Sequence, residues 1–267
     1  MRRENRSVAD IEYSVERGVA TITLNRPERK NAFTVPMIDQ WAELVRRART
    51  DEAVRVVILT GAGEAFCAGI DMDSLDEIGH DPLAWKALLN DHINHVAFAM
   101  EELDKPVIAA VSGPAVGAGM DMALMCDMRF AAPSARFSEG YIRLGLVPGD
   151  GGCYYLPRLV GPAVALELLL TGNFIDAEQA ERYGIVNRVI RDGDLMEATR
   201  AVAMKIAERS PLAVRLTKRA LYQSLRSDLR TSLDLISSHM ALIHTTRDAA
   251  EAVDAFRTKR SPHFEGR

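Results

Sequence analysis

Two mostly apolar runs, at residues 54–60 and 106–111, dominate the hydrophobic pattern of this chain. A strand that is buried on both faces, as in a parallel sheet, reads as such a run. Each run is followed by a glycine-rich turn, at residues 65–71 and 113–119, and then by a segment that can begin a helix. The pattern therefore predicts two buried strands that each pass through a turn into a helix.

The N-terminal part predicts three further elements. Apolar residues at 11–15 and 19–24, separated by a short turn, are typical of a β-hairpin. A proline well placed for a first helical turn predicts a helix over residues 36–49. Asp-Pro then opens a long helix over residues 81–103, whose many apolar positions indicate a largely buried element.

The second half changes character near residue 190. Short strands and helices are predicted before this point, at 119–125, 128–131, 135–137, 163–171 and 184–190. From residue 195 onward the pattern is helical, with breaks at 210–211, 228 and 247. We expect an α/β body in residues 1–190 and a helical region in residues 191–267 that packs against the body or a neighbouring subunit.

Composition narrows the class of protein. The 267 residues are 48% hydrophobic and 26% charged, with a formal net charge of −4, which favours neither nucleic acid nor an anionic membrane. No signal peptide or membrane-spanning stretch is apparent. Cys67, Cys126 and Cys153 lack metal-ligand spacing, so we expect free thiols in the reducing cytoplasm. His92 and His95 share a helix face without a third ligand, and we expect no metal site.

The two glycine-rich turns point to a specific chemistry. Two strand-to-helix turns can aim two free backbone N–H groups at one oxygen, which makes an oxyanion hole for a carbonyl. Glycine lets a ligand approach the backbone closely. Either turn alone is compatible with an ordinary loop of an α/β protein, but the pairing of two such turns favours the oxyanion hole.

A series of motifs accompanies these turns. They include Asn25-Arg26-Pro27, Leu59-Thr60-Gly61, Ala65-Phe66-Cys67-Ala68-Gly69-Ile70-Asp71, Cys126-Asp127, Leu156-Pro157-Arg158 and Ser261-Pro262-His263-Phe264. In their order and spacing the chain resembles the enoyl-CoA hydratase/isomerase (crotonase) superfamily over nearly its whole length. The resemblance implies a crotonase-like α/β spiral of ββα units with a C-terminal helical trimerisation region. It also implies a homotrimer or a hexamer built as a dimer of trimers, and a CoA thioester ligand.

The resemblance also assigns binding residues. The two oxyanion donors fall on the N–H groups of Ile70 and Ala118. Substrate contacts fall on the following residues around the two turns: Ala68, Gly69, Asp71 and Gly117. Lys30, Phe256 and Lys259 match positions near the CoA moiety, and the last two often reach in from a neighbouring subunit. Charge makes a lysine–phosphate contact plausible, while a solvated lysine is the alternative.

The acid–base groups depart from the hydratase pattern. Hydratases of the superfamily commonly use two glutamates that hold one water, and their positions fall on Asp121 and Tyr141. A phenol with a pKa of ~10 is a poor base at neutral pH, so we expect Tyr141 to orient water or substrate. Asp150, between glycines, is either a turn residue or the partner of Asp121 in proton transfer. We expect Glu139 to be a solvated or ion-paired loop residue.

The sequence therefore predicts an acyl-CoA-processing enzyme. The leading reaction is hydration of a 2-enoyl-CoA to a 3-hydroxyacyl-CoA through a thioester enolate, without a metal or redox cofactor. The first alternative is an enoyl-CoA isomerase, or a hydrolase of β-dicarbonyl carbon–carbon bonds, that uses Asp121 or Asp150 alone. The second is a non-catalytic CoA- or RNA-binding relative, against which the absence of basic excess argues.

Overall fold

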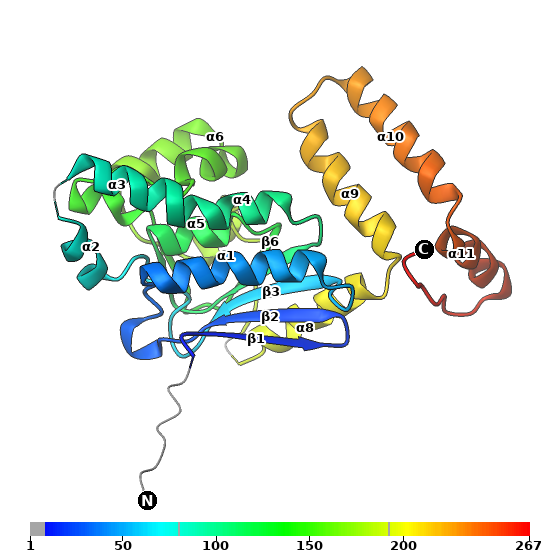
Figure 1. Ribbon diagram of the computed structural model, residues 1–267, viewed down its shortest axis with the longest axis horizontal. Coiled ribbons are helices and arrows are strands. Elements are labelled where there is room, and N and C mark those ends of the chain that lie inside the picture. Colours follow the sequence, from blue (N-terminus) through cyan, green and yellow to red (C-terminus); the bar gives the residue numbers. More distant parts are fainter. Residues whose placement is uncertain (1–8, 80, 192) are drawn as a thin grey trace, which may run out of the picture.

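The body of the protein is built around a six-stranded sheet, in a computed structural model that describes residues 9–79, 81–191 and 193–267 (Figure 1). The strands, in spatial order, are β1 (Ile11–Glu16), β2 (Val19–Leu24), β3 (Val56–Gly61), β4 (Val107–Val111), β6 (Met128–Ala131) and β9 (Arg188–Val189). The predicted hairpin is confirmed, because β1 and β2 pair antiparallel. All other neighbours in this sheet are parallel.

Eleven α-helices surround the sheets within these described residues. They are α1 (Val35–Thr50), α2 (Met72–Ile78), α3 (Pro82–Leu88), α4 (Asn94–Glu102), α5 (Ala118–Leu124), α6 (Gly152–Thr171), α7 (Ala177–Arg182), α8 (Leu195–Ala207), α9 (Pro211–Ser224), α10 (Leu229–His244) and α11 (Arg247–Thr258). The extent of the long helix predicted over 81–103 is confirmed, although a π-helical turn over Leu89–Ile93 joins α3 to α4. The expectation that it is largely buried is wrong, because Leu83 and Phe98 are 73% and 54% exposed.

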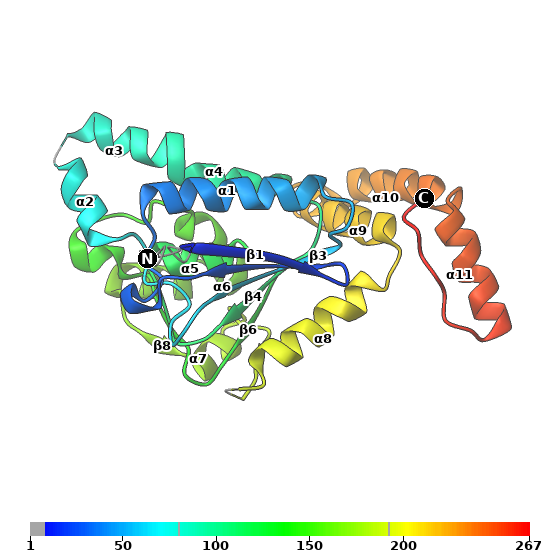
Figure 2. The ribbon, with the colours of Figure 1, turned by 60° about the horizontal axis from the view of Figure 1, so that its bottom comes forward.

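The two apolar strands are buried on both faces, as predicted. Because side chains alternate along a strand, Val57 and Leu59 of β3 enter a large core that also contains buried side chains of α1 and α4. Val56 and Ile58 enter a second core that α8 closes. Figure 2 shows the sheet between α1 on one side and α8 on the other. This double covering explains why the strand sequence is apolar at nearly every position.

A second sheet continues directly from the first and was not predicted as such. It contains β5 (Pro114–Val116), β7 (Arg136–Ser138) and β8 (Ile175–Asp176). The chain turns from β4 into β5 at Gly113, where φ is +60° and an added Cβ would lie 1.8 Å from the Glu64 carbonyl oxygen. Only glycine fits such an approach. The order β4, β5, α5 and then β6, β7, α6 is the expected repeat of ββα units.

The helix α6 differs from its prediction in two ways. It begins nine residues before Gly161-Pro162, because the glycines and proline of its first half read as a loop. It is also, among the described residues, a 20-residue helix apolar enough to cross a membrane by length and composition alone, contrary to the expectation of no such stretch. However, Gly161 is non-helical (φ 78°, ψ 163°) and divides it into two segments, each far short of the ~20 residues that a span requires.

The last three helices extend away from the sheets and form a C-terminal arm, residues 211–267 (Figures 1 and 2). Two ion pairs hold α9 to the body: Arg215 with Asp104 (2.6 Å) and Lys218 with Asp127 (2.7 Å). The arm exposes large apolar side chains, among them Leu221, Leu225, Leu229, Leu233, Met240 and Leu242.

Candidate active site

The two glycine-rich turns lie side by side. Cys67 in the first turn forms a parallel bridge with Ala115 in the second. The Val116 N–H donates to the Cys67 carbonyl oxygen at 3.0 Å, and the N–H groups of Phe66 and Cys67 donate to the Pro114 oxygen at 3.0 and 3.1 Å. The pairing that the sequence suggested is therefore built into the backbone.

This pairing brings the two predicted donors, Ile70 and Ala118, close together. Phe33 bridges the residues on either side of Ile70, since its N–H donates to the Gly69 oxygen (2.9 Å) and its oxygen accepts from the Asp71 N–H (2.8 Å). The Ile70 N–H therefore faces away from Phe33. Ala118 is the first residue of α5, so its N–H has no intrahelical partner. Gly69 (φ +95°), the residue before Ile70, lies close to Ala118. A Cβ added to Gly69 would be 3.6 Å from the Ala118 nitrogen.

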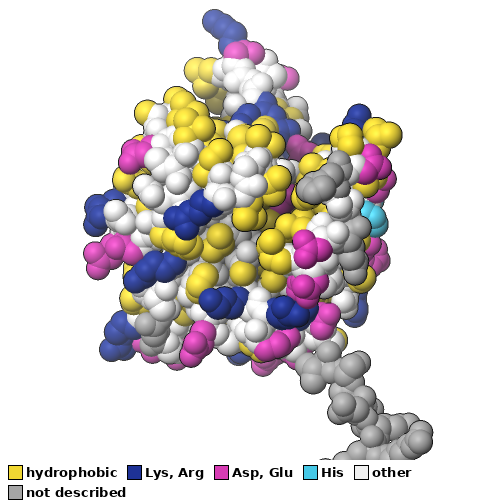
Figure 3. All heavy atoms as spheres, turned by 90° about the vertical axis from the view of Figure 1, so that its left-hand side faces the viewer, with side chains coloured by type: hydrophobic (Ala, Val, Ile, Leu, Met, Phe, Trp, Pro, Cys, Tyr) yellow, Lys and Arg dark blue, Asp and Glu magenta, His cyan; other side chains and the backbone are white. Residues whose placement is uncertain are grey.

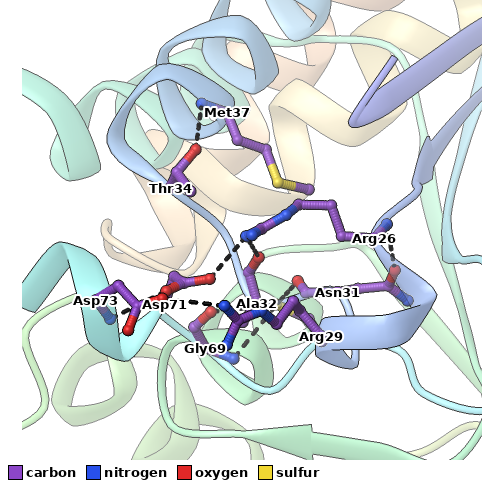
Figure 4. A network of polar contacts seen from close by, with 10 residues as sticks. Arg26, Arg29, Asn31, Ala32, Thr34, Met37, Gly69, Asp71 and Asp73 are labelled. Atoms are coloured by element: carbon purple, nitrogen blue, oxygen red, sulfur yellow. Dashed lines mark hydrogen bonds and ion pairs between the residues drawn. The ribbon is translucent and has the colours of Figure 1, made fainter. Parts of the chain in front are cut away.

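The loop at residues 25–33 supports the first turn (Figure 4). The Lys30 oxygen accepts from the Ala68 N–H at 3.0 Å, which places Lys30 at the edge of this turn. The Asn31 amide nitrogen donates to the oxygens of Ala62 (2.9 Å) and Ala65 (2.7 Å). Asn31 was not predicted as a supporting residue, although it lies in a part of the chain that resembles the superfamily.

Asp71, predicted to contact substrate, has a carboxylate that is already engaged. It is buried, accepts from Arg26 Nη1 at 2.9 Å, and caps α2 by accepting from the Asp73 N–H at 3.0 Å (Figure 4). Burial alone would raise the pKa of Asp71, but the Arg26 and Asp73 hydrogen bonds hold it below its ordinary value. The side chain therefore fixes the segment that carries Ile70.

The predicted acid–base residues converge beside these turns. The Tyr141 hydroxyl lies 2.7 Å from Asp121 Oδ2 and 2.9 Å from Asp150 Oδ2. Asp121, on α5, is 0% exposed, and Asp150, in the loop before α6, is 4% exposed. The Tyr141 ring lies 3.6 Å from the position of a Cβ on Gly117, the residue before Ala118. One phenol thus joins two carboxyl groups next to a predicted oxyanion donor.

Burial and mutual repulsion determine the charge of this cluster. The pKa of Asp121 is raised well above its usual value by burial and by the neighbouring Glu139 and Asp150 carboxyls. Burial raises the pKa of Asp150 to about 6, although the Tyr141 hydrogen bond opposes this. Burial and the nearby carboxylates also raise the pKa of Tyr141, which stays protonated. At neutral pH, Asp121 is therefore protonated and is the acid of the pair, whereas Asp150 is ionised.

The expectation for Glu139 was wrong. Its side chain is 0% exposed and makes no ion pair, and neither carboxyl oxygen has a hydrogen-bond partner among the described residues. Burial raises the pKa of Glu139 to about 7; the neighbouring Asp121 carboxyl opposes this shift, and Asp150 adds to it. A carboxyl in a short loop next to glycine gives no signal of such burial in the sequence.

Other predicted residues lie elsewhere. Phe256, 87% exposed, and Lys259 are on α11, at the opposite end of the molecule from α2 and the first glycine turn (Figure 1). They cannot reach the site of their own chain. His92 is paired with Asp39 at 2.9 Å. Within the described residues, no group of three or more His, Cys, Asp or Glu side chains could hold a metal ion.

A comparison with known families shows which family the chain belongs to. The family model described as enoyl-CoA hydratase/isomerase matches residues 14–267. The chain belongs to this family. Two of its relatives are the 1,2-epoxyphenylacetyl-CoA isomerase of Escherichia coli, 39% identical over 95% of this chain and 97% of the relative, and the short-chain-enoyl-CoA hydratase of Clostridium acetobutylicum, 37% identical over 91% and 92%.

Solved structures of the family share the fold. The crystal structure of enoyl-CoA hydratase from Bacillus anthracis has a TM-score of 0.93 at 35% identity and covers 97% of this chain and 100% of that one. A putative enoyl-CoA hydratase from Streptomyces coelicolor has a TM-score of 0.91 at 36% identity, with 100% of both chains covered. Because family members are named for both hydration and isomerisation, membership does not choose the reaction.

Proposed function

We propose that this protein binds an acyl-CoA thioester and hydrates a 2-enoyl-CoA to a 3-hydroxyacyl-CoA. One observation carries the proposal: the Tyr141 hydroxyl joins the Asp121 and Asp150 carboxyls beside the N–H groups of Ile70 and Ala118, for which the described residues offer no backbone acceptor. The thioester oxygen would accept from both N–H groups. Each such donor stabilises the enolate-like transition state by ~3–4 kcal/mol, judged by the usual cost of its removal.

The acid–base groups complete the reaction. Asp150, as a carboxylate, takes a proton from a water whose oxygen bonds to Cβ. Electrons of the carbon–carbon double bond move to the thioester oxygen, and Tyr141 delivers a proton to Cα as the carbonyl re-forms. Tyr141 is reprotonated by Asp121, and the proton on Asp150 returns through the hydroxyl, which is within hydrogen-bond distance of both carboxyls.

A second candidate is double-bond isomerisation. The Tyr141 hydroxyl contacts both the Asp121 and Asp150 carboxyls, and it can carry a proton between them without a bound water. In that case Asp150 removes a proton from one carbon, and the same chain returns it to another. The 39% identity to an isomerase also supports this candidate.

A substrate panel distinguishes the two reactions. Crotonyl-CoA and longer 2-enoyl-CoA thioesters would be assayed by loss of enone absorbance, and 3-enoyl-CoA thioesters by its gain, with product identification by mass spectrometry. Hydration predicts a mass increase of one water from 2-enoyl substrates. Turnover of only 3-enoyl substrates, without mass change, would replace hydration by isomerisation. No turnover of any enoyl-CoA would reject both.

The surface around the site is compatible with such a ligand. The end of the molecule that carries α2, α3 and α6 combines exposed apolar side chains with several Lys and Arg (Figure 3). An acyl chain is apolar and the CoA phosphates are anionic, so both kinds of contact are available. We propose no further cofactor, no nucleic acid or membrane partner, and a cytoplasmic location.

We also propose that the chain assembles as a homotrimer or as a dimer of trimers. The apolar side chains on the C-terminal arm need a partner, and Phe256 and Lys259 can contact CoA only in a neighbouring subunit. Light scattering coupled to size-exclusion chromatography would measure three or six times the 29.4 kDa chain mass. A monomer at micromolar concentration would reject this assembly.

A further inference from the structure

A third carboxyl group, Glu139, lies behind the Tyr141 bridge and has no role in the reaction described above. Asp121 Oδ1 and both Glu139 oxygens are buried, and none of the three has a hydrogen-bond partner in the part of the chain that the structure describes. Buried polar atoms are almost always paired, so three such oxygens in one place require an explanation. Two carboxyl groups can satisfy each other only when at least one of them carries a proton.

Gly152 shows that these oxygens face the same point. A Cβ added to Gly152 would lie 2.6 Å from Asp121 Oδ1 and 2.8 Å from Glu139 Oε2. The two carboxyls therefore meet in the space that the missing side chain leaves, at the first residue of α6. Asp121 thus presents one oxygen to Glu139 and the other to Tyr141.

No Lys, Arg or His of the described residues forms an ion pair with this cluster. The titratable groups around Asp121 are Glu139, Tyr141 and Asp150, and the buried Cys67 thiol lies near Asp150. None of the ion pairs among residues 9–79, 81–191 and 193–267 involves the three carboxyls. The start of α6 contributes only the partial positive charge of its free N–H groups. Three carboxylates cannot all be ionised in such surroundings.

We propose that Glu139 is a positioning residue that acts through Asp121 by donating a proton to Asp121 Oδ1. The donated hydrogen bond keeps the proton of Asp121 on Oδ2, where it faces the Tyr141 hydroxyl. Tyr141 then donates to Asp150, which carries the single negative charge and is the most exposed of the three carboxyls. In the order Glu139, Asp121, Tyr141, Asp150, each group donates a hydrogen bond to the next. Asp121 Oδ1 thereby gains a donor, which it otherwise lacks among the described residues. The proposal rests on the proposed function.

The substitution Glu139→Gln separates a titrating role from a packing role. Its amide N–H₂ group can still donate to Asp121 Oδ1 but cannot lose a proton. With the wild-type protein we expect kcat to fall as pH rises through about 7, because an ionised Glu139 draws the Asp121 proton to Oδ1. With Glu139→Gln we expect kcat at pH 6.5 within about threefold of wild type, an unchanged KM, and an alkaline limb moved upward by at least one pH unit.

Two controls complete the test. Glu139→Met, which has neither a donor nor a titrating proton, should lower kcat at pH 6.5 about tenfold or more and should also lose the alkaline limb near pH 7. Asp248→Asn removes another buried carboxylate, in the C-terminal arm, and should leave the pH profile unchanged. An alkaline limb of Glu139→Gln that coincides with that of wild type would overturn the proposal.

A spectroscopic measurement tests the proposal independently of turnover. Infrared difference spectra of the wild-type protein should contain a protonated-carboxyl C=O band that titrates near pH 7 and is absent from Glu139→Gln. Lack of any difference between the two proteins would reject the role of Glu139 even if the enzyme hydrates enoyl-CoA. A clear difference would support it even if the reaction proved to be isomerisation.

Discussion

At the scale of single residues, the site depends on one hydroxyl that joins carboxyls from two different elements. The sequence identified Asp121, Tyr141 and Asp150 because each falls in a motif of the superfamily or in a glycine-flanked turn. It did not identify Glu139, because its environment is created by Gly152 and α5 rather than by its own neighbours. Burial of a charged side chain is a tertiary property that local pattern does not contain.

Removal of the bridging hydroxyl should slow the reaction without unfolding the site. Tyr141→Phe keeps the ring beside Gly117 but breaks the contacts to Asp121 and Asp150. We expect kcat to fall about 10²–10³-fold with KM within a few-fold, as steady-state kinetics would measure. Tyr13→Phe removes a buried hydroxyl that has no hydrogen-bond partner among the described residues, and it should leave kcat unchanged. Equal kinetics for the two variants would contradict the role of Tyr141.

At the scale of elements, the oxyanion turn is held from a distant part of the chain. Arg26 and Asp71 are 45 positions apart, and their contact connects the loop before α1 to the start of α2. The glycine pattern predicted the turn because that signal is local. The contact of Asp71 with Arg26 was not predicted because the two residues are far apart in the sequence. For the same reason, the second sheet and the first half of α6 were missed, while β3, β4 and the hairpin were predicted.

The Arg26–Asp71 pair gives a stability prediction with a matched control. Asp71→Asn keeps a good helix cap but leaves the Arg26 guanidinium without its counter-charge, at side-chain exposures of 15% and 5% for the two residues. We expect the free energy of unfolding to fall by about 3 kcal/mol in urea titrations. Asp73→Asn breaks the exposed Arg29–Asp73 pair and should change it by less than about 1 kcal/mol. Similar changes in the free energy of unfolding for both variants would contradict a larger contribution of the buried pair.

At the scale of the whole molecule, the acid cluster should make stability depend on pH. Asp150 and Glu139 have pKa values raised to about 6 and about 7 in the folded protein, above the 3.8 and 4.5 of the unfolded chain. The folded state therefore binds more protons between about pH 4 and pH 7, and stability falls as pH rises through this window. Above about pH 7, this loss of stability is complete.

Denaturant unfolding at pH 5 and pH 8, at fixed protein concentration, would measure this loss. Asp150→Asn should recover about 3 kcal/mol of it at pH 8, because two pKa units correspond to that amount. Asp150→Asn should at the same time lose activity, because the carboxylate that destabilises the folded protein is the one that the proposed reaction uses. A wild-type protein whose stability is flat or rises between pH 5 and pH 8 would contradict the raised pKa values.

The complete burial of Asp121 also decides the fate of an isotopic label. The three carboxyls are buried, with Asp121 and Glu139 0% exposed and Asp150 4% exposed, so a deuteron that Asp150 removes from the substrate exchanges slowly with bulk water. If the protein isomerises a deuterated 3-enoyl thioester, the product should therefore retain part of the label at its new carbon. Hydration instead takes both of its hydrogens from water, so the label already present in the substrate stays where it was.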